Sequence, residues 1–354
     1  MDRRFKIIGS WLFCFLLISS TGLTATRHKP IFAVTEDGYR IALHRFSSTT
    51  DVPASKYPIL ICHGITTNVW SFDVDPNRSL PRYLADRGFD VYVMELRGHG
   101  SSSNKPMNRG IKKKGWDLTD YAELDLPAAM QLVFRQTGTS RLHYIGHSMG
   151  GIVALIHSSI HPNPPFASLT LISSPVRLRL VSDYPRMLLN YEIFHRMTSF
   201  NVGILAKTSL LMPPEPLEMI YATLYNTDSI DLKTGRKFLW RGVGSIAGDE
   251  GRQFVSIDRN NRLCDRSGAH SYTSNLWGLP CPVLVISGKL DELAPMGDVA
   301  AVLDYLGPGD RTHINFGRAD GYKVDYGHMD YLFGKYAPVE VFPAITEWIK
   351  ERDL

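Results

Sequence analysis

Short apolar runs alternate with segments of helical periodicity through most of the chain, and this alternation predicts the fold. The runs that indicate strands are residues 31–34, 40–46, 57–64, 89–96, 141–146, 167–175, 282–288 and 311–316. Helical periodicity covers residues 78–87, 120–136, 150–160, 301–307 and 339–352. Because apolar strands separated by helices are typical of parallel sheets, we predict an α/β fold with a mainly parallel sheet and helices on both faces. The first two runs flank a tight-turn signal, Glu36-Asp37-Gly38, and should form an antiparallel edge.

The alternation of strands and helices stops between residues 179 and 275. This segment is first rich in Leu, Met, Tyr and Phe, and then becomes polar and rich in Gly. Its pattern is mostly helical, so we interpret it as an insertion between two halves of one sheet. The sequence therefore predicts a core in two parts, 26–178 and 276–354, separated by the insertion 179–275.

The first 25 residues have the pattern of a targeting segment. A basic stretch, 1–6, precedes an apolar run, 7–18, and small and polar residues lead to Ala25. We predict a secretory signal peptide, with an uncleaved membrane anchor as the alternative. Either reading indicates a secreted or otherwise extracytoplasmic protein, or one anchored in a membrane through this segment.

Charge and cysteine content narrow the classes of function. The formal net charge of +4 is too small to indicate a nucleic-acid partner. Outside the first 25 residues the cysteines are Cys62, Cys264 and Cys281, so at most one internal disulfide can form, and Cys264 with Cys281 is the sensible pair. Cys62 ends an apolar strand and should be a buried small residue. No pair of Cys or His has the spacing of a zinc site.

The strongest chemical signal is the pentapeptide Gly146-His147-Ser148-Met149-Gly150. It lies between a predicted strand and a predicted helix, where an abrupt turn exposes one side chain above the sheet. Glycines two residues before and two after the serine remove side chains that would collide as the chain folds back. The pattern predicts that Ser148 is a catalytic nucleophile; the alternative is a glycine-rich turn that only packs.

A nucleophilic serine needs a histidine base and a carboxylate that orients this base, in the chain order Ser, acid, His. Asp291 lies in the loop that leaves the strand 282–288, so we predict it as the acid, with Glu292 as the rival. His328 lies between the last strand and the last helix and is the predicted base. Other histidines fit less well: His313 should point into the sheet packing, His270 lies in the insertion, and His63 precedes the serine.

The oxyanion of the tetrahedral intermediate needs two backbone N–H donors. Met149, the residue after the serine, should supply one of them. The second should come from the loop after the strand 57–62, where His63-Gly64 lets the backbone approach closely, and we predict Ile65 as this donor.

These motifs together resemble the α/β-hydrolase superfamily. The resemblance rests on GHSMG at the serine, HG at 63–64, ELRGHGSS at 95–102, GKLDELAP at 288–295 and GHMD at 327–330. EDGYRIALHRF at 36–46, followed by HGITTNVWSF at 63–72, is similar to the acid-lipase branch. The resemblance implies an ester hydrolase in which 179–275 is a cap or lid over the site. The segment 317–325, in the loop before His328, departs from the pattern of the shortest family members.

The predicted activity is hydrolysis of carboxylic esters through a Ser-His-Asp triad and an acyl-enzyme. The Leu, Met and Phe content of the insertion suits lipid-like or medium-chain acyl esters, although such a stripe is also typical of plain cap packing. We expect no metal and no organic cofactor, and a small-molecule or lipid ester as substrate, with a membrane surface as a further partner. The alternatives are an acyltransferase, an amidase or a carbon–carbon hydrolase on the same triad, and a non-catalytic binding protein on a hydrolase scaffold.

Overall fold

The computed structural model describes residues 24–48, 52, 54–107, 115–178, 197–211 and 221–353. Residues 1–23 of the predicted signal peptide or anchor lie outside this part of the chain. Within the described ranges, no helix is both long and apolar enough to cross a membrane.

Nine strands of the described chain form one sheet in the order β1-β3-β5-β4-β6-β7-β10-β11, with β2 paired to β3. Their bounds are β1 Thr26–Arg27, β2 Ile31–Val34, β3 Arg40–Ser47, β4 Ile59–Cys62, β5 Val91–Glu95, β6 Leu142–His147, β7 Phe166–Ile172, β10 Val283–Gly288 and β11 Arg311–Phe316. All neighbours from β5 through β4, β6, β7 and β10 to β11 pair in parallel. The pairs of β3 with β1, β2 and β5 are antiparallel, which confirms the predicted antiparallel edge.

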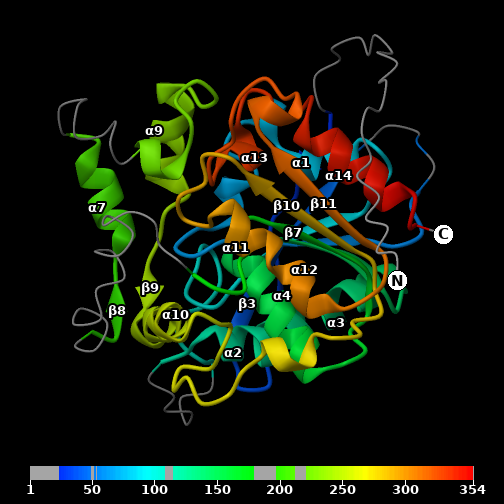
Figure 1. Ribbon diagram of the computed structural model, residues 1–354, viewed down its shortest axis with the longest axis vertical. Helices are drawn as coiled ribbons and strands as arrows, with labels where there is room; N and C mark the ends of the chain where they lie inside the picture. Colours follow the sequence, from blue (N-terminus) through cyan, green and yellow to red (C-terminus); the bar gives the residue numbers. More distant parts are fainter. Residues whose placement is uncertain are drawn as a thin grey trace, which may run out of the picture.

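Helices cover both faces of this sheet (Figure 1). Their bounds are α1 Leu80–Ala85, α2 Leu118–Asp120, α3 Leu126–Thr137, α4 Met149–Ile160, α11 Met296–Ala300, α12 Val302–Leu306, α13 Asp330–Phe333 and α14 Val341–Lys350. One apolar cluster packs α3, α4, α11 and α12 on one face, and a second packs α1, α13 and α14 on the other. A parallel sheet buried on both sides explains why its strands are continuously apolar rather than alternating.

The predicted insertion contains a small separate sheet as well as helices. Its described elements are β8 Ser199–Phe200, α7 Val202–Ser209, α9 Leu232–Arg241, β9 Ile246–Ala247 and α10 Gly248–Asn260. The strands β8 and β9 pair antiparallel outside the main sheet. In Figure 1 these elements stand together on the left of the molecule, with α7 and β8 outermost. Residues 179–196 and 212–220 of the insertion lie outside the described ranges.

A buried arginine fixes the loop that follows β5. Arg97 is fully buried, and its guanidinium donates to Asp37 in the hairpin turn and to Asp125 before α3. Burial alone would lower the pKa of Arg97, but the two carboxylates raise it well above its ordinary value. This ion cluster ties three segments of the core together next to the loop 95–102.

The suggested disulfide does not form. Cys264 and Cys281 are free and buried, as is Cys62 at the end of β4. The Cys264 thiol faces the hydroxyl of Ser256, at 3.5 Å, and packs in the apolar cluster on the α3–α4 face. Burial is also the main reason that the pKa of the Cys281 thiol rises to about 12. Both residues therefore act as small core residues, as predicted for Cys62 alone.

Candidate active site

Ser148 lies at the turn between β6 and α4 in a conformation that few residues other than glycine adopt. Its backbone angles are φ 52° and ψ −119°, and it stands directly before the first residue of α4. The turn is held because the Ser148 N–H donates to the carbonyl of Ile172 at the end of β7, at 2.8 Å. A non-glycine residue with positive φ is strained, and such strain is found where a side chain must be presented for function.

The two glycines around Ser148 are required by close backbone approach. A Cβ on Gly146 would overlap the backbone of Gly150 and Gly151, where the helix turns back over the strand. A Cβ on Gly150 would overlap the carbonyl oxygens of Cys62 and His63 at the end of β4. The glycine spacing in the sequence therefore reflects collisions that the turn must avoid, as the sequence analysis expected.

Asp291 and His328 meet at the carboxyl end of the sheet. Asp291 follows β10, His328 follows β11, and both side chains are buried. His328 Nδ1 lies 3.0 Å from Asp291 Oδ1 and 2.9 Å from Oδ2. Because a carboxylate only accepts, the Nδ1–H of the imidazole is the donor, and Nε2 is left to act as a base.

Three further groups fix the Asp291 carboxylate. Oδ1 accepts the backbone N–H groups of Leu293 and Ala294, at 3.1 and 2.8 Å. Oδ2 accepts the hydroxyl of Ser173, at 2.6 Å. The rival acid, Glu292, is exposed and lies outside this network. Sequence reasoning missed Ser173, because its place directly after β7, at the carboxyl edge of the sheet, does not by itself distinguish it from other polar residues of loops.

His147 connects the serine turn to the loop that carries His328. Its ring lies 4.7 Å from the ring of His328, centroid to centroid, and its Nε2–H donates to the His328 carbonyl, at 2.9 Å. Burial, with His328 nearby, holds the pKa of His147 well below its ordinary value, so this ring stays neutral. The serine turn and the histidine loop are therefore adjacent, whereas the Ser148 hydroxyl has no hydrogen-bond partner among the described residues. The hydrogen bond between a nucleophilic serine and its histidine base often forms fully only when substrate binds.

The loop after β4 lies against Ser148. A Cβ built on Gly64 would lie 3.1 Å from the Ser148 Cβ, so the backbone of this loop runs directly beside the serine. Within the described chain, no protein acceptor takes the backbone N–H of Ile65 or that of Met149. Unpaired N–H groups at the start of a helix favour negative charge, here next to the serine. Met149 follows Ser148 directly, and Ile65 follows the glycine that lies beside it, so both predicted oxyanion donors belong to segments next to the serine.

The rival histidines occupy other places. His63 Nδ1–H donates to the Gly64 carbonyl and Nε2 accepts the Leu96 N–H, so both ring nitrogens serve the local structure. Burial lowers the pKa of His63 to about 3, which keeps it neutral. The expectation that His313 points into the sheet packing is wrong: β11 is an edge strand, and the His313 side chain is exposed and bonded to Ser287.

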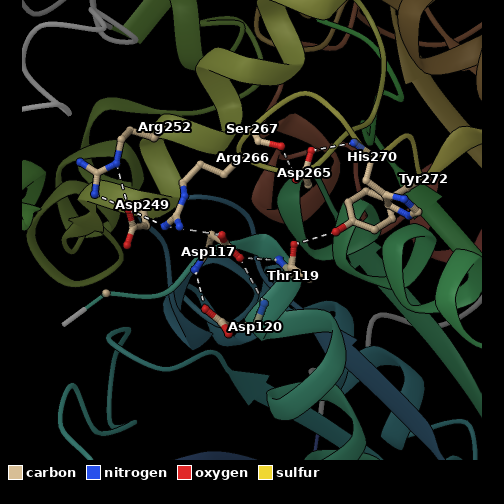
Figure 2. Close-up of a pocket in the computed structure, with 11 residues that line it drawn as sticks. Asp117, Thr119, Asp120, Asp249, Arg252, Asp265, Arg266, Ser267, His270 and Tyr272 are labelled. Atoms are coloured by element: carbon tan, nitrogen blue, oxygen red, sulfur yellow. Dashed lines mark hydrogen bonds and ion pairs between the residues drawn. The ribbon is translucent and has the colours of Figure 1, made fainter. Parts of the chain in front are cut away.

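His270 lies in a separate polar hollow of about 750 Å³ between the insertion and the core (Figure 2). Charges in this hollow are largely paired: Arg266 Nη1 lies 2.6 Å from Asp249 Oδ1 and 3.9 Å from Asp117 Oδ2. None of the predicted site residues lines it. Over the described ranges, no group of three or more His, Cys, Asp or Glu side chains has the arrangement of a metal site.

Comparisons with known proteins agree with the fold and with the class of enzyme. A family model described as the alpha/beta hydrolase fold matches residues 57–198. A probable lipase of Schizosaccharomyces pombe is 23% identical over 90% of this chain and 76% of its own. Human lipase member K is 24% identical over 90% of this chain and 86% of its own. A solved thermophilic esterase from Thermogutta terrifontis superposes with a TM-score of 0.59, at 19% identity, over 92% of this chain and all of its own.

The protein has the α/β-hydrolase fold, as its parallel sheet with helices on both faces and its strand-to-helix turn at Ser148 already indicated. Within this fold it is an enzyme of the lipase and esterase type. Both results confirm what the sequence motifs led us to expect.

Proposed function

We propose that this protein hydrolyses carboxylic esters with Ser148 as nucleophile, His328 as general base and Asp291 as the group that orients the base. The observation that carries the proposal is the meeting of the strained Ser148 turn with the His328–Asp291 pair, joined by the contacts of His147. The three residues come from the carboxyl ends of β6, β10 and β11, where reactive groups of α/β folds gather.

In this mechanism His328 Nε2 takes the proton of the Ser148 hydroxyl as its oxygen attacks the ester carbonyl. Asp291 holds the Nδ1–H tautomer and stabilises the imidazolium that forms. The imidazolium then protonates the leaving alcohol and an acyl-enzyme remains. Water, deprotonated by His328, attacks this acyl-enzyme and releases the acid. No step requires a metal or an organic cofactor.

The oxyanion of each tetrahedral intermediate lies between the backbone N–H groups of Ile65 and Met149. Loss of one such donor costs about 3–4 kcal/mol of transition-state stabilisation. The loop of Ile65 is held by the insertion, because the Gly244 N–H donates to the Thr66 carbonyl and Ile65 packs beside Ile246 and Val255. These contacts support the proposal that residues 179–275 form a cap over the site.

The substrate class we propose is lipid-like or medium-chain acyl esters. The relatives named as lipases support this class, as does the apolar packing of the insertion against the loop of Ile65. We further propose that the protein works outside the cytoplasm, after export directed by the segment 1–25. A lipid surface would then be its partner, and the helices α7 and α9 carry the side chains that suit one.

The surface of α7 and α9 combines exposed apolar side chains with positive charge. Several large apolar side chains in these helices, or just beyond their ends, are mostly exposed: Ile204, Leu205, Leu211, Leu232 and Trp240. The basic residues are Lys207, Lys233, Arg236, Lys237 and Arg241, and Lys207 lies over the Trp240 ring. Apolar and basic side chains on adjacent helices favour the interface of an anionic lipid layer.

The mechanism is tested with a fluorophosphonate probe and a panel of p-nitrophenyl esters from acetate to palmitate. Ser148→Ala should abolish labelling and lower kcat by at least about 1,000-fold with the fold retained. Asp291→Asn should be severely impaired, whereas its matched control Glu292→Gln should stay within about twofold of the wild type, because the exposed carboxyl does not reach His328. Labelling that survives in Ser148→Ala, or a wild type inactive on every ester, would refute the proposal.

A further inference from the structure

A second carboxyl lies buried two residues after the proposed base. Asp330 begins α13 and is fully shielded from solvent. Its Oδ2 accepts the backbone N–H of Gly327, at 2.6 Å, and that of Asn226, at 2.9 Å. Gly327 precedes His328 directly, whereas Asn226 belongs to the predicted insertion. One carboxyl oxygen therefore joins the loop of the base to the insertion.

The same two segments are joined at further points. The residues 224–229 of the insertion face the loop 325–330 and the turn that follows it. The additional bonds run from Met329 N–H to the Leu224 carbonyl, at 3.0 Å, from Asn226 Nδ2 to the Asp325 carbonyl, at 2.9 Å, and from Lys335 N–H to the Ser229 carbonyl, at 2.9 Å. The backbone on either side of His328 is thus held by the insertion, while His147 holds its carbonyl.

Burial of this carboxyl is costly, and its surroundings compensate only in part. Burial raises the pKa of Asp330 to about 7, although the two backbone donors and the nearby Ser229 hydroxyl oppose this rise. Its second oxygen, Oδ1, has no hydrogen-bond partner among the described residues. The contact is also tight, because a Cβ on Gly327 would lie 3.1 Å from the Tyr225 Cα and 3.2 Å from Asp330 Oδ2. A half-satisfied buried group of this kind calls for an explanation beyond stability.

We propose that Asp330 is a positioning residue for His328: its carboxyl clamps the Gly327 and Asn226 N–H groups together, so that the insertion fixes the orientation of the base. The inference rests on the proposed role of His328. A base displaced by about 1 Å loses on the order of 100-fold in rate, because the imidazole no longer lines up with both the nucleophile and its acid.

The test compares Asp330→Ala, Asp330→Asn and the control Glu340→Gln in the full chain. Glu340 is matched because its carboxylate also accepts from this loop, from the Lys323 N–H and the Tyr326 hydroxyl, but does not touch Gly327. Steady-state rates on p-nitrophenyl butyrate give kcat and KM. Hydrogen–deuterium exchange of the segments 221–230 and 325–333 reports the clamp without any turnover.

Asp330→Ala should lose 10- to 100-fold in kcat with KM within about threefold, and both segments should exchange faster. Asp330→Asn keeps an acceptor oxygen and should recover most of the rate, and Glu340→Gln should behave as the wild type. If Asp330→Ala does not fold, Asn226→Ala removes the bonds of that side chain to the Asp325 carbonyl and to the Asp228 N–H, keeps the backbone N–H that Asp330 accepts, and should lower kcat about threefold with faster exchange at 325–333. Unchanged kcat in the folded variants, or a slower rate without faster exchange, would overturn the clamp. Failure of the proposed function shows separately, as a wild type that no fluorophosphonate labels.

Discussion

At the scale of single residues, the site depends on glycines whose lack of a side chain lets two backbone segments touch. Gly150 packs its Cα against the carbonyls of Cys62 and His63, directly before the loop that carries Ile65. Gly150→Ala should therefore push this loop away from Ser148 and lower kcat by about 100-fold or more, since a shift of about 1 Å is enough. The control is Gly297→Ala in α11, where an added Cβ meets nothing within 4 Å.

Gly297→Ala should leave kcat within about twofold and raise the free energy of unfolding by roughly 0.4–1 kcal/mol, because the unfolded chain loses freedom. Kinetics with p-nitrophenyl butyrate and urea unfolding measure both effects. Equal kcat in the two variants would show that the contact of Gly150 with the end of β4 does not set the oxyanion geometry.

The residues that hold the acid and the loop of the base in place could not be predicted from the sequence. Ser148, Asp291 and His328 could be predicted because chain order and strand position restrict where each can lie. Ser173 and Asp330 follow no such rule: their partners are a carboxylate 118 residues away and an amide 104 residues away. Only the folded chain shows that these groups meet, so a pattern in one sequence cannot distinguish them from other polar residues of loops.

At the scale of elements, the predicted strands and helices of the core correspond closely to the observed ones. Continuous apolar runs predict buried strands well, because a sheet covered on both faces accepts few polar positions. The insertion was harder, since its short strands β8 and β9 have two residues each and carry no periodicity. The helix predicted at 120–136 contains a π-helical turn, Tyr121–Asp125, which helical spacing alone does not reveal.

The pair α7 and α9 makes a prediction at this scale. Replacing Ile204, Leu205 and Trp240 by serine should lower binding to vesicles of phosphatidylcholine and phosphatidylglycerol by at least 10-fold, because each large apolar side chain contributes about 1.5–3 kcal/mol when buried. Sedimentation with vesicles measures this binding. Added salt should weaken it in the wild type, since Lys and Arg each contribute about 1 kcal/mol near an anionic surface.

The matched control is Trp277→Ser, which removes another exposed tryptophan, 67% accessible, outside these helices. Both variants should hydrolyse soluble p-nitrophenyl butyrate at the wild-type rate. Equal loss of vesicle binding in the two variants, or a wild type that stays in the supernatant, would contradict a lipid surface at α7 and α9.

At the scale of the whole molecule, buried histidines and buried carboxyls act on stability in opposite directions. Burial, with His99 or His161 nearby, lowers the pKa of His63 to about 3 and that of His157 to about 4, and it lowers those of His143 and His147 too. Such groups stabilise the fold above pH 6.5, and this stability is lost as the pH falls. Burial raises the pKa of Asp125 to about 6 and that of Asp330 to about 7, so their contribution is full below pH 3.8 and is lost as the pH rises.

Near pH 5.5 unfolding should therefore take up close to one proton at each of His63, His147 and His157, and should release most of one at Asp125 and at Asp330. The net is an uptake of about one proton, so the free energy of unfolding should rise by roughly 1 kcal/mol per pH unit. Above pH 7 the curve should flatten, since the histidines no longer bind protons in the unfolded chain. Urea unfolding at pH 4.5, 5.5, 6.5 and 7.5 measures this slope.

Two variants with opposite expected effects test the assignment. His157→Gln keeps an N–H for the Ala122 carbonyl but removes one group that takes up a proton on unfolding. Its unfolding free energy should therefore rise less steeply with pH, by the equivalent of about one proton. Asp125→Asn removes one group that releases a proton on unfolding, so the rise of the unfolding free energy with pH should steepen by about the same amount. The variant should also be less stable at every pH, because Arg97 loses a charged partner. Slopes that shift in the same direction would mean that these buried groups do not control the pH dependence, and carboxylates with lowered pKa, such as Glu95, would then have to dominate it.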